Sequence, residues 1–174
     1  MSIDERRSFI PINIAVLTIS DTRTANEDKS GDILVERLIA DGHTLVSRDL
    51  VKDDLETIVA KLEDWLKVPN IDVIITTGGT GITGRDVTPE AMERVSEKPI
   101  EGFGELFRWI SYQKIGTSTI QSRACAVVSN GKYLFSLPGS PGACKDGWDE
   151  ILHYQLNNQF RPCNFVELIP RLKE

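Results

Sequence analysis

The feature that most constrains the fold is an alternation of two patterns in the first half of the chain. The runs Ile12–Ser20 and Ile71–Thr77 are almost continuously apolar and β-branched, which is typical of strands buried on both faces of a parallel sheet. Between them, apolar residues recur at helical spacing over residues 33–39 and 58–66, on either side of a half-polar strand, Thr44–Val51. This order predicts an α/β protein, a three-layer α/β/α sandwich with a mostly parallel sheet.

The second half of the chain predicts an antiparallel edge for this sheet. Asn130-Gly131 separates the strand-like runs Cys125–Ser129 and Lys132–Leu137, and this dipeptide is a strong signal for a β-hairpin. Apolar residues at helical spacing then predict a closing helix over residues 148–156. The mostly parallel sheet should therefore end in an antiparallel hairpin.

Several helix ends carry recognisable signals. Gly42 can take the left-handed position that closes the first helix. The D-x-x-E pattern of Asp53–Glu56 predicts the start of the second helix. Thr88-Pro89 predicts an N-cap followed by proline at the first helical position, and a further helix is expected around residues 103–110.

The length of the chain favours one domain over residues 1–174, with an N-terminal arm, 1–11, and a C-terminal tail, 161–174. The tail carries two prolines and gives no clear element, so it is a candidate for packing against a neighbouring subunit.

Composition excludes several classes of protein. The net charge is −6 and no basic segment stands out, which disfavours nucleic acid binding. No apolar run approaches the roughly 20 residues that cross a bilayer, and the N-terminus lacks the apolar core of a secretory signal. We therefore expect a cytoplasmic protein. Cys125, Cys144 and Cys163 are too widely spaced for a zinc motif or a disulfide framework, which predicts free, mostly buried thiols.

The predicted topology gathers the unusual residues at one edge of the sheet. Right-handed crossovers place every strand-to-helix loop on the same side, where ligands bind in open α/β sheets. The segments that follow the predicted strands are Ser20-Asp21, Asp53, the loop Gly78–Asp86 and the tight loop Pro138–Gly142. The sequence therefore predicts one site at the carboxyl ends of the strands.

The glycine-rich loop in the stretch Thr76–Ala91 has two interpretations, a phosphate cradle or a structural turn. Glycine lets backbone N–H groups approach an anion, and the following helix adds partial positive charge. Gly79 to Gly84 fits G-x-G-x-x-G, yet the helix begins too late for a dinucleotide fingerprint. The same glycines fit G-x-x-x-x-G, but Arg85-Asp86 replaces the Lys-Ser/Thr of a P-loop. Neither motif is complete.

Two carboxylates near this loop suggest a metal ion. A carboxylate beside a phosphate cradle is unfavourable unless a cation lies between them, and Mg²⁺ is usually held by one or two carboxylates plus substrate phosphates. Asp86 ends the glycine-rich loop, and Asp53 follows the neighbouring strand. Asp53 could equally be the N-cap of the second helix, and Ser20-Asp21 could be turn residues only.

Three motifs in order along the chain carry a family resemblance. They are TTGGTG-x-x-x-RDVTPEA, GFGELFR-x-x-S-x-x-x-IGTSTIQSRA and LPGSPGAC. Together they resemble the molybdenum cofactor biosynthesis proteins of the MoaB/MogA type, over nearly the whole chain. The tail residues 161–165, Arg-Pro-Cys-Asn-Phe, and the modest length are more similar to the B branch than to the longer adenylyltransferase branch.

The resemblance implies the molybdopterin-binding fold, a trimer or hexamer, and a role in molybdenum cofactor assembly. Active members of the family transfer AMP from Mg-ATP to the terminal phosphate of molybdopterin, with Mg²⁺ and no tightly bound organic cofactor. The resemblance therefore implies a molybdopterin adenylyltransferase. The alternative is a non-catalytic molybdopterin-binding paralogue that acts as a carrier or as a partner of other cofactor-assembly proteins.

The resemblance also implies roles for individual residues. Asp53 and Asp86 match the catalytic carboxylates that hold Mg²⁺ through the substrate phosphates, with Asp54 as the one-residue alternative to Asp53. The residues implied in phosphate and nucleotide binding are Thr77, Gly78, Gly79, Thr80, Gly81, Pro138, Gly139, Ser140 and Gly142. Those implied in pterin binding are Ser20, Asp21, Ser118, Ser122 and Arg123.

Overall fold

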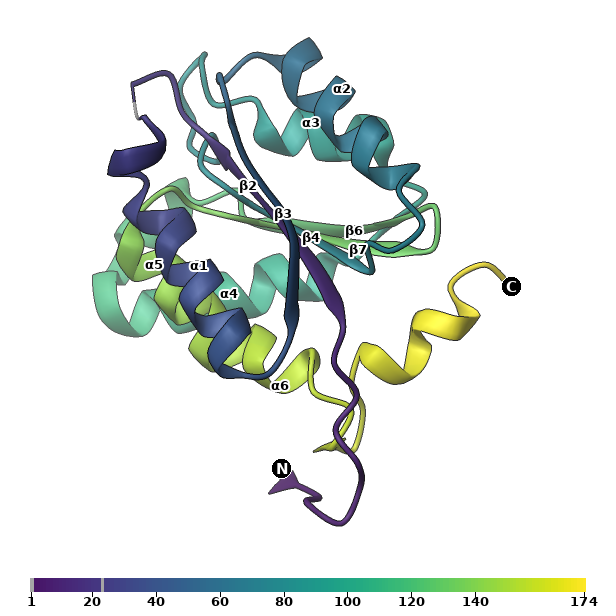
Figure 1. The fold of residues 1–174 in the computed structure, drawn as a ribbon. Coiled ribbons are helices and arrows are strands. Elements are labelled where there is room, and N and C mark those ends of the chain that lie inside the picture. The colour runs from purple at the N-terminus through teal and green to yellow at the C-terminus, as the bar shows by residue number, and fades with distance from the viewer. Residues whose placement is uncertain (1, 23) are drawn as a thin grey trace.

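The centre of the molecule is a six-stranded sheet in the order β3-β2-β4-β7-β6-β5 (Figure 1). The computed structural model describes residues 2–22 and 24–174. The strands of this sheet are β2 (Asn13–Ile19), β3 (Thr44–Val51), β4 (Val73–Thr77), β5 (Lys98–Pro99), β6 (Cys125–Ser129) and β7 (Lys132–Leu137). Neighbours from β3 to β7 are parallel, whereas β6 runs antiparallel to both β7 and β5. The predicted sandwich and its antiparallel hairpin edge are confirmed, and the two-residue strand β5 extends that edge.

Helices cover both faces of the sheet. In Figure 1, α2 and α3 lie over one face, and α1, α4, α5 and α6 lie over the other. The α-helices are α1 (Lys29–Ala40), α2 (Leu55–Leu66), α3 (Thr88–Val95), α4 (Glu101–Ile115), α5 (Pro141–Gly147) and α6 (His153–Gln155). The closing helix predicted over 148–156 begins earlier, at Pro141, and its segment Trp148–Leu152 is π-helical. Within residues 2–22 and 24–174, no helix is long and apolar enough to span a membrane.

The central strands are apolar throughout because both of their faces are buried. In β2, Ile14 and Val16 pack into the layer under α1 and α4, while Ala15 and Leu17 pack into the layer under α2 and α3. All four side chains are fully buried. This two-sided burial explains why the strand shows no alternation between apolar and polar residues.

The second helix begins one residue later than its D-x-x-E pattern predicts. Asp54, not Asp53, occupies the N-cap position of α2, and its carboxylate accepts a hydrogen bond of 2.9 Å from the backbone N–H of Thr57. The prediction that Asp53 starts the helix is therefore wrong. Because Asp54 satisfies the helix end, the side chain of Asp53 is available at the edge of the sheet.

The start of α3 also differs from its prediction by one residue. Thr88 is the first helical residue, Val87 occupies the N-cap position, and Pro89 follows inside the first turn. The Thr88 hydroxyl donates a hydrogen bond of 2.8 Å to the carbonyl of Gly78, and its backbone N–H donates to Gly79 over 3.0 Å. Thr88 therefore anchors the glycine-rich loop instead of capping its own helix.

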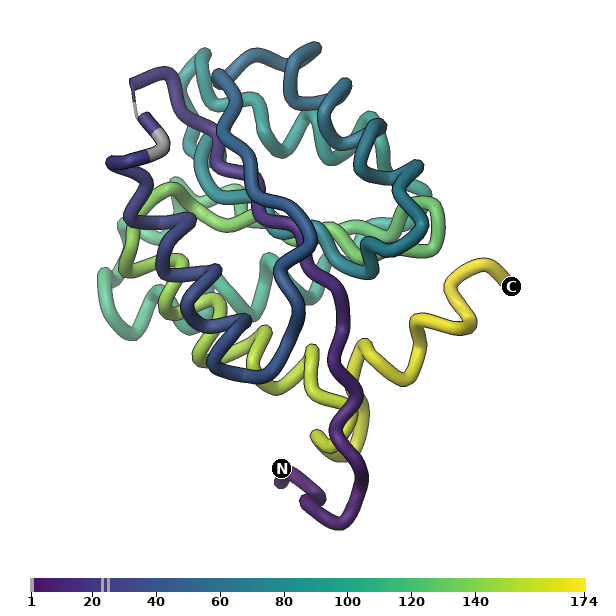
Figure 2. The backbone as a smooth tube through the Cα atoms, viewed as in Figure 1, coloured from purple at the N-terminus to yellow at the C-terminus, as the bar shows by residue number. Residues whose placement is uncertain are grey.

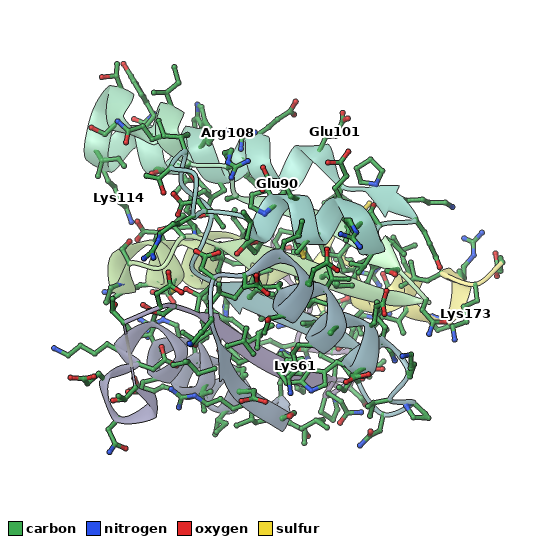
Figure 3. All side chains as sticks on the ribbon, turned by 90° about the horizontal axis from the view of Figure 1, so that it is seen from above. Lys61, Glu90, Glu101, Arg108, Lys114 and Lys173 are labelled. Carbon is green, nitrogen blue, oxygen red and sulfur yellow. The ribbon has the colours of Figure 1, made fainter. Side chains whose placement is uncertain are left out.

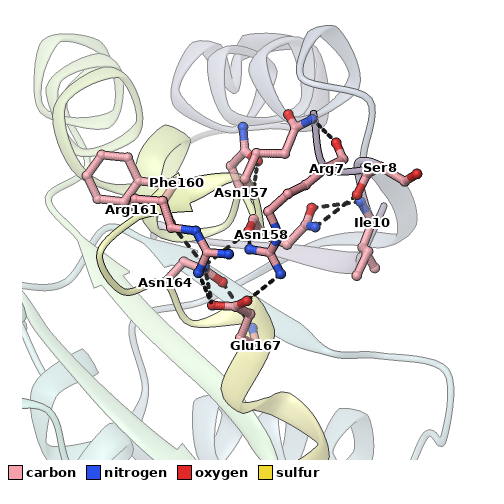
Figure 4. A network of polar contacts seen from close by, with 10 residues as sticks. Arg7, Ser8, Ile10, Asn157, Asn158, Phe160, Arg161, Asn164 and Glu167 are labelled. Atoms are coloured by element: carbon pink, nitrogen blue, oxygen red, sulfur yellow. Dashed lines mark hydrogen bonds and ion pairs between the residues drawn. The ribbon is translucent and has the colours of Figure 1, made fainter. Parts of the chain in front are cut away.

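The N-terminal arm lies beside the start of the C-terminal tail, below the sheet in Figure 2. Strand β1 (Ser2–Ile3) pairs antiparallel with β8 (Phe160–Arg161). Figure 4 shows the polar network around this pairing, in which Arg7 binds the carboxylate of Glu167 over 2.5 Å. Asn158 donates to the carbonyl of Ser8 over 2.9 Å. These contacts hold the N-terminal arm against the tail.

The C-terminal tail packs on its own chain. The ring of Phe165 lies 4.7 Å from that of Tyr133 and 5.6 Å from that of Phe135, both on β7, and Val166 is buried in the same layer. The start of the 3-10 helix Val166–Arg171 is therefore part of the core. Packing of the exposed remainder of the tail against a neighbouring subunit stays a prediction.

The cysteines differ in burial. All three are free thiols; Cys144 is buried, Cys125 is partly buried and Cys163 is exposed. Burial raises the pKa of Cys125 to about 11, so this thiol stays protonated at neutral pH. The prediction of mostly buried thiols is confirmed for Cys125 and Cys144 and is wrong for Cys163.

His43 gives a testable pH dependence of stability. Its ring lies 5.2 Å from that of Phe9 and 6.3 Å from that of Trp148, with 6% of the residue exposed. Burial lowers the pKa of His43 to about 4, below its ordinary value of 6.5. The unfolded chain therefore binds a proton below pH 6.5 that the folded chain excludes, so acidification destabilises the fold.

We expect His43 to reduce the free energy of unfolding by about 2 kcal/mol when the pH falls from 7 to 5. Urea unfolding at both pH values measures this change. The variant His43→Gln has no imidazole to titrate, so its stability should change less over the same interval. An equal change in both proteins would show that the protonation of His43 does not contribute.

Candidate functional site

The carboxyl ends of the parallel strands open into a cleft of about 430 Å³. Ser20 and Asp21 follow β2, and Asp53 follows β3. The glycine-rich loop follows β4, and Pro138–Ser140 follows β7. The cleft therefore lies where the predicted topology gathers the strand-to-helix loops. It is bordered by carboxylates and by glycine backbone, two groups that suit a phosphate ligand bound with a cation.

The glycine-rich loop is packed too closely to accept a side chain at its start. Gly78 and Gly79 have φ angles of +107° and +62°, in the region that favours glycine. A Cβ atom on Gly78 would lie 2.1 Å from the carbonyl oxygen of Ile19. A Cβ atom on Gly79 would lie 2.3 Å from the Thr88 hydroxyl and 2.8 Å from both carboxylate oxygens of Asp53. Both positions therefore require glycine.

Asp53 lies directly against this loop. One of its carboxylate oxygens accepts a hydrogen bond of 3.3 Å from the backbone N–H of Val87. Burial raises the pKa of Asp53, and the negative charges of Asp86 and Asp21 raise it further. The group is half-buried among other acids, so a bound cation would stabilise its ionised form.

Asp86 has a different environment. Its Oδ2 accepts hydrogen bonds from the backbone N–H of Thr83 over 2.9 Å and from the Thr83 hydroxyl over 2.6 Å. Burial opposes ionisation, but these hydrogen bonds and the charge of Arg123 outweigh it and keep the pKa of Asp86 below its ordinary value. Asp86 is therefore a fixed, ionised carboxylate at the mouth of the cleft.

Asp21 connects two of the loops that border the cleft. Its Oδ1 accepts a hydrogen bond of 3.2 Å from the backbone N–H of Asp53, and its Oδ2 lies 3.1 Å from the guanidinium of Arg85. The hydroxyl of Ser20 accepts from the backbone N–H of Thr22 over 3.3 Å, which is a turn contact. Both residues line the cleft and both also stabilise the loop, so the two interpretations of Ser20-Asp21 are compatible.

The structure brings most of the predicted site residues together. Those that line the cleft are Ser20, Asp21, Asp53, Gly78, Gly79, Thr80, Gly81, Asp86, Ser122, Pro138, Gly139 and Ser140. Those outside its lining are Thr77, Ser118, Arg123 and Gly142. Thr77 is buried and donates to the carbonyl of Pro138 over 3.0 Å, Ser118 is exposed on a 3-10 helix, and Gly142 lies within α5.

One wall of the cleft was not predicted. Phe107, Ser111 and Ile115 line it from α4, on one face of the helix at intervals of four residues. All three belong to the second family motif, in which the spacing F-x-x-x-S-x-x-x-I is visible in the sequence. The wall combines apolar surface with a hydroxyl, which suits a flat heterocyclic ring with polar edges.

A family model described as a probable molybdopterin binding domain matches residues 15–158. The chain belongs to the molybdopterin-binding family. Molybdenum cofactor biosynthesis protein B of Escherichia coli (strain K12) is 43% identical to it over 166 residues, covering 95% of this chain and 96% of that protein. The protein of the same name from Bacillus anthracis is 44% identical over 161 residues, covering 91% of this chain and 95% of that protein. These relatives agree with the predicted B branch of the family.

Solved structures of this molybdopterin-binding family share the fold. A crystal structure of molybdenum cofactor biosynthesis protein B has a TM-score of 0.85 and 40% identity, and covers 94% of this chain and 97% of that one. The tungsten cofactor synthesizing protein MoaB from Pyrococcus furiosus has a TM-score of 0.78 and 33% identity, and covers 94% and 98% of the two chains. The fold implied by the resemblance is confirmed.

Proposed function

We propose that this protein acts in molybdenum cofactor biosynthesis, where its cleft binds molybdopterin and transfers AMP from Mg-ATP to the terminal phosphate. One observation carries the proposal: two carboxylates face the glycine backbone of a single loop. A Cβ atom on Gly79 would lie 2.8 Å from the Asp53 carboxylate, and one on Gly81 would lie 2.7 Å from Oδ2 of Asp86. The proposed phosphate cradle therefore lies directly between two acids.

The residues present fit Mg²⁺. Carboxylate oxygens are its preferred protein ligands, and it usually binds one or two of them together with substrate phosphates. Asp53 and Asp86 would hold the ion in this cleft. Among the described residues, no group of three or more histidines, cysteines or acids is placed to hold a metal ion without further ligands. When bound, the ion supplies positive charge to the phosphates.

Adenylyl transfer requires positioning and charge neutralisation rather than a protein nucleophile. A terminal phosphate oxygen of molybdopterin would attack the α-phosphorus of ATP, forming one P–O bond while the bond to the leaving pyrophosphate breaks. That phosphate is largely ionised near neutrality, with a second pKa of about 6, so no general base is needed. The backbone of Gly78–Gly81 would position the phosphates. Ser111 and Ile115, which line the cleft from α4, would contact the pterin.

Incubation of the purified protein with molybdopterin and Mg-ATP tests this proposal. We expect pyrophosphate and an adenylylated pterin, identified by mass spectrometry, to form in equal amounts. Binding of molybdopterin without either product would contradict the proposed transfer and would support the non-catalytic carrier instead.

We also propose that the protein is a homo-oligomer, a trimer or a hexamer. A groove of about 960 Å³ lies between α3 and α4, and its lining includes the apolar side chains of Ile100 and Ile120. On and beside α4, Trp109 is 64% exposed and Ile120 is 81% exposed. Apolar surface of this kind is typical of protein interfaces.

Light scattering tests the oligomeric state. We expect a mass of three or six times the 19.4 kDa of the chain, and a smaller mass for Trp109→Glu. Ile39→Glu is the control, because Ile39 is 56% exposed on α1, away from this groove. A mass of 19.4 kDa for the unmodified protein would exclude the oligomer.

A further inference from the structure

Arg123 directly follows Ser122, which lines the cleft, but the side chain of Arg123 does not line the cleft and contacts the backbone of the glycine-rich loop instead. Its Nε donates to the carbonyl of Gly81 over 2.7 Å, and its Nη2 donates to the carbonyl of Asp86 over 2.6 Å. The backbone N–H of Arg123 donates to a third carbonyl of the loop, that of Thr80, over 2.9 Å. One residue therefore holds the loop at three backbone positions, on both sides of its exposed turn.

Apart from Arg123, the turn between these positions is held mainly by hydrogen bonds within the turn itself. The backbone N–H of Asp86 donates to the carbonyl of Thr83 over 3.1 Å, and the backbone N–H of Thr83 donates to Oδ2 of Asp86 over 2.9 Å. Residues 82–85 are all exposed. Their contact with the next loop is the surface ion pair between Arg85 and Asp21, and Arg85 is 80% exposed. Surface pairs of this kind hold a loop weakly.

The guanidinium group suits this anchoring. Its donors lie in one plane and in fixed directions, so a single group reaches the carbonyls of Gly81 and Asp86 together. The remaining Nη1 donates to the carboxylate of Glu90 over 2.5 Å, which fixes the orientation of the group. Lysine would offer a single ammonium group and could not reproduce this geometry.

We infer that Arg123 is a positioning residue, which fixes the carboxylate of Asp86 relative to the glycine backbone at Gly81. This role differs from the pterin contact implied by the family resemblance. The inference rests on the proposed function, because that function gives Asp86 its role with Mg-ATP. Arg123 acts on the reaction only through the loop and touches neither substrate.

Kinetics of Arg123→Ala test the inference in the full-length protein. Because misplacing a group by about 1 Å can cost about 100-fold in rate, we expect a kcat about 100-fold lower and a higher Mg²⁺ requirement, with the KM for molybdopterin within about threefold. Guanidinium ion added at tens of millimolar should restore at least about a tenth of the lost rate, because it can occupy the space left by the side chain. The variant Arg123→Lys should regain a smaller part of the rate lost in Arg123→Ala than guanidinium ion restores.

A neighbouring arginine provides the matched control. Arg108, labelled on α4 in Figure 3, donates to the carbonyl of Ala124 over 3.1 Å and, among the described residues, makes no hydrogen bond or ion pair with the glycine-rich loop. Arg108→Ala removes the same charge and a hydrogen bond to a backbone carbonyl, that of Ala124, the residue before β6. Arg108 and Arg123 both line the groove between α3 and α4, so the two variants are compared at equal oligomeric mass. We then expect the kcat of Arg108→Ala to stay within about twofold of the unmodified value, because the loop keeps its anchor.

Hydrogen exchange gives a second readout that needs no activity. In Arg123→Ala, the amides of Thr83 and Asp86 should exchange at least about tenfold faster, while those of β7 remain unchanged. Unchanged exchange, or a molybdopterin KM raised tenfold with an unchanged kcat, would overturn the inference. So would a general loss of stability without rescue by guanidinium. If the unmodified protein shows no transfer, the proposed function fails, while loop exchange still decides whether Arg123 orders this turn.

Discussion

We expect the substitution Asp86→Asn to lower the rate of the proposed adenylyl transfer by about 100- to 1,000-fold and to leave molybdopterin binding within about threefold. The amide is nearly isosteric, and its oxygen can still accept the hydrogen bonds from Thr83 that measure 2.9 and 2.6 Å in the structure. The negative charge that would hold Mg²⁺ is lost. Transfer rates at saturating substrates, together with equilibrium binding of molybdopterin, measure the two effects separately.

Asp54→Asn is the matched control for this variant. Asp54 is an exposed carboxylate one residue from Asp53, and it caps α2 through its hydrogen bond to Thr57. Because asparagine is also a good N-cap, the control should keep both its stability and its rate. Equal rates for Asp86→Asn and for the unmodified protein would remove Asp86 from the catalytic machinery.

We expect the substitution Gly81→Val to abolish binding at the proposed phosphate cradle and to leave the fold largely intact. A Cβ atom at Gly81 would lie 2.7 Å from Oδ2 and 3.0 Å from Cγ of Asp86, so the substitution displaces the carboxylate and covers the backbone beside it. We expect affinity for Mg-ATP to fall by at least about 100-fold, since close approach to the backbone is lost. The melting temperature should change by only a few degrees, because the turn that follows Gly81 is exposed.

Gly84 offers the control in the same turn. A Cβ atom there meets nothing within 4 Å, and Gly84 is not among the glycines with positive φ. Gly84→Val should therefore retain both affinity and stability. For Gly81→Val, a melting temperature lowered by many degrees with normal affinity in the folded fraction would support a purely structural turn and remove the phosphate-cradle assignment.

The arrangement of the sheet was predictable because burial on both faces leaves a direct record in the sequence. Strands such as Val73–Thr77 consist of consecutive buried residues, and the Asn130-Gly131 turn fixes the hairpin locally. Helix starts were less predictable, since Asp53 and Asp54 carry the same side chain and only the backbone decides which one caps α2. The direction of the tail depends on where Phe165 meets the sheet, a long-range contact without a local signal.

The meeting of the strand-to-helix loops at one cleft was predictable, because the topology of the sheet determines it. The loops that follow parallel strands lie at the same edge of the sheet. The sequence alone therefore predicts that Asp53, the glycine-rich loop and Pro138 lie close together, as they do in the cleft. The directions of individual side chains could not be predicted from the sequence. Ser122 lines the cleft, whereas the side chain of Arg123 points the other way and hydrogen-bonds the carbonyl of Gly81, because successive residues in an extended chain point to opposite sides.

A crystal structure of the protein with Mg²⁺ and adenylylated molybdopterin tests the proposed site most directly. We expect the product in the cleft at the carboxyl ends of the strands, with its phosphates against Gly78–Gly81 and the metal ion bound by Asp53 and Asp86. Product bound instead in the groove between α3 and α4, or phosphates that contact neither the glycine backbone nor the two carboxylates, would contradict the proposed site.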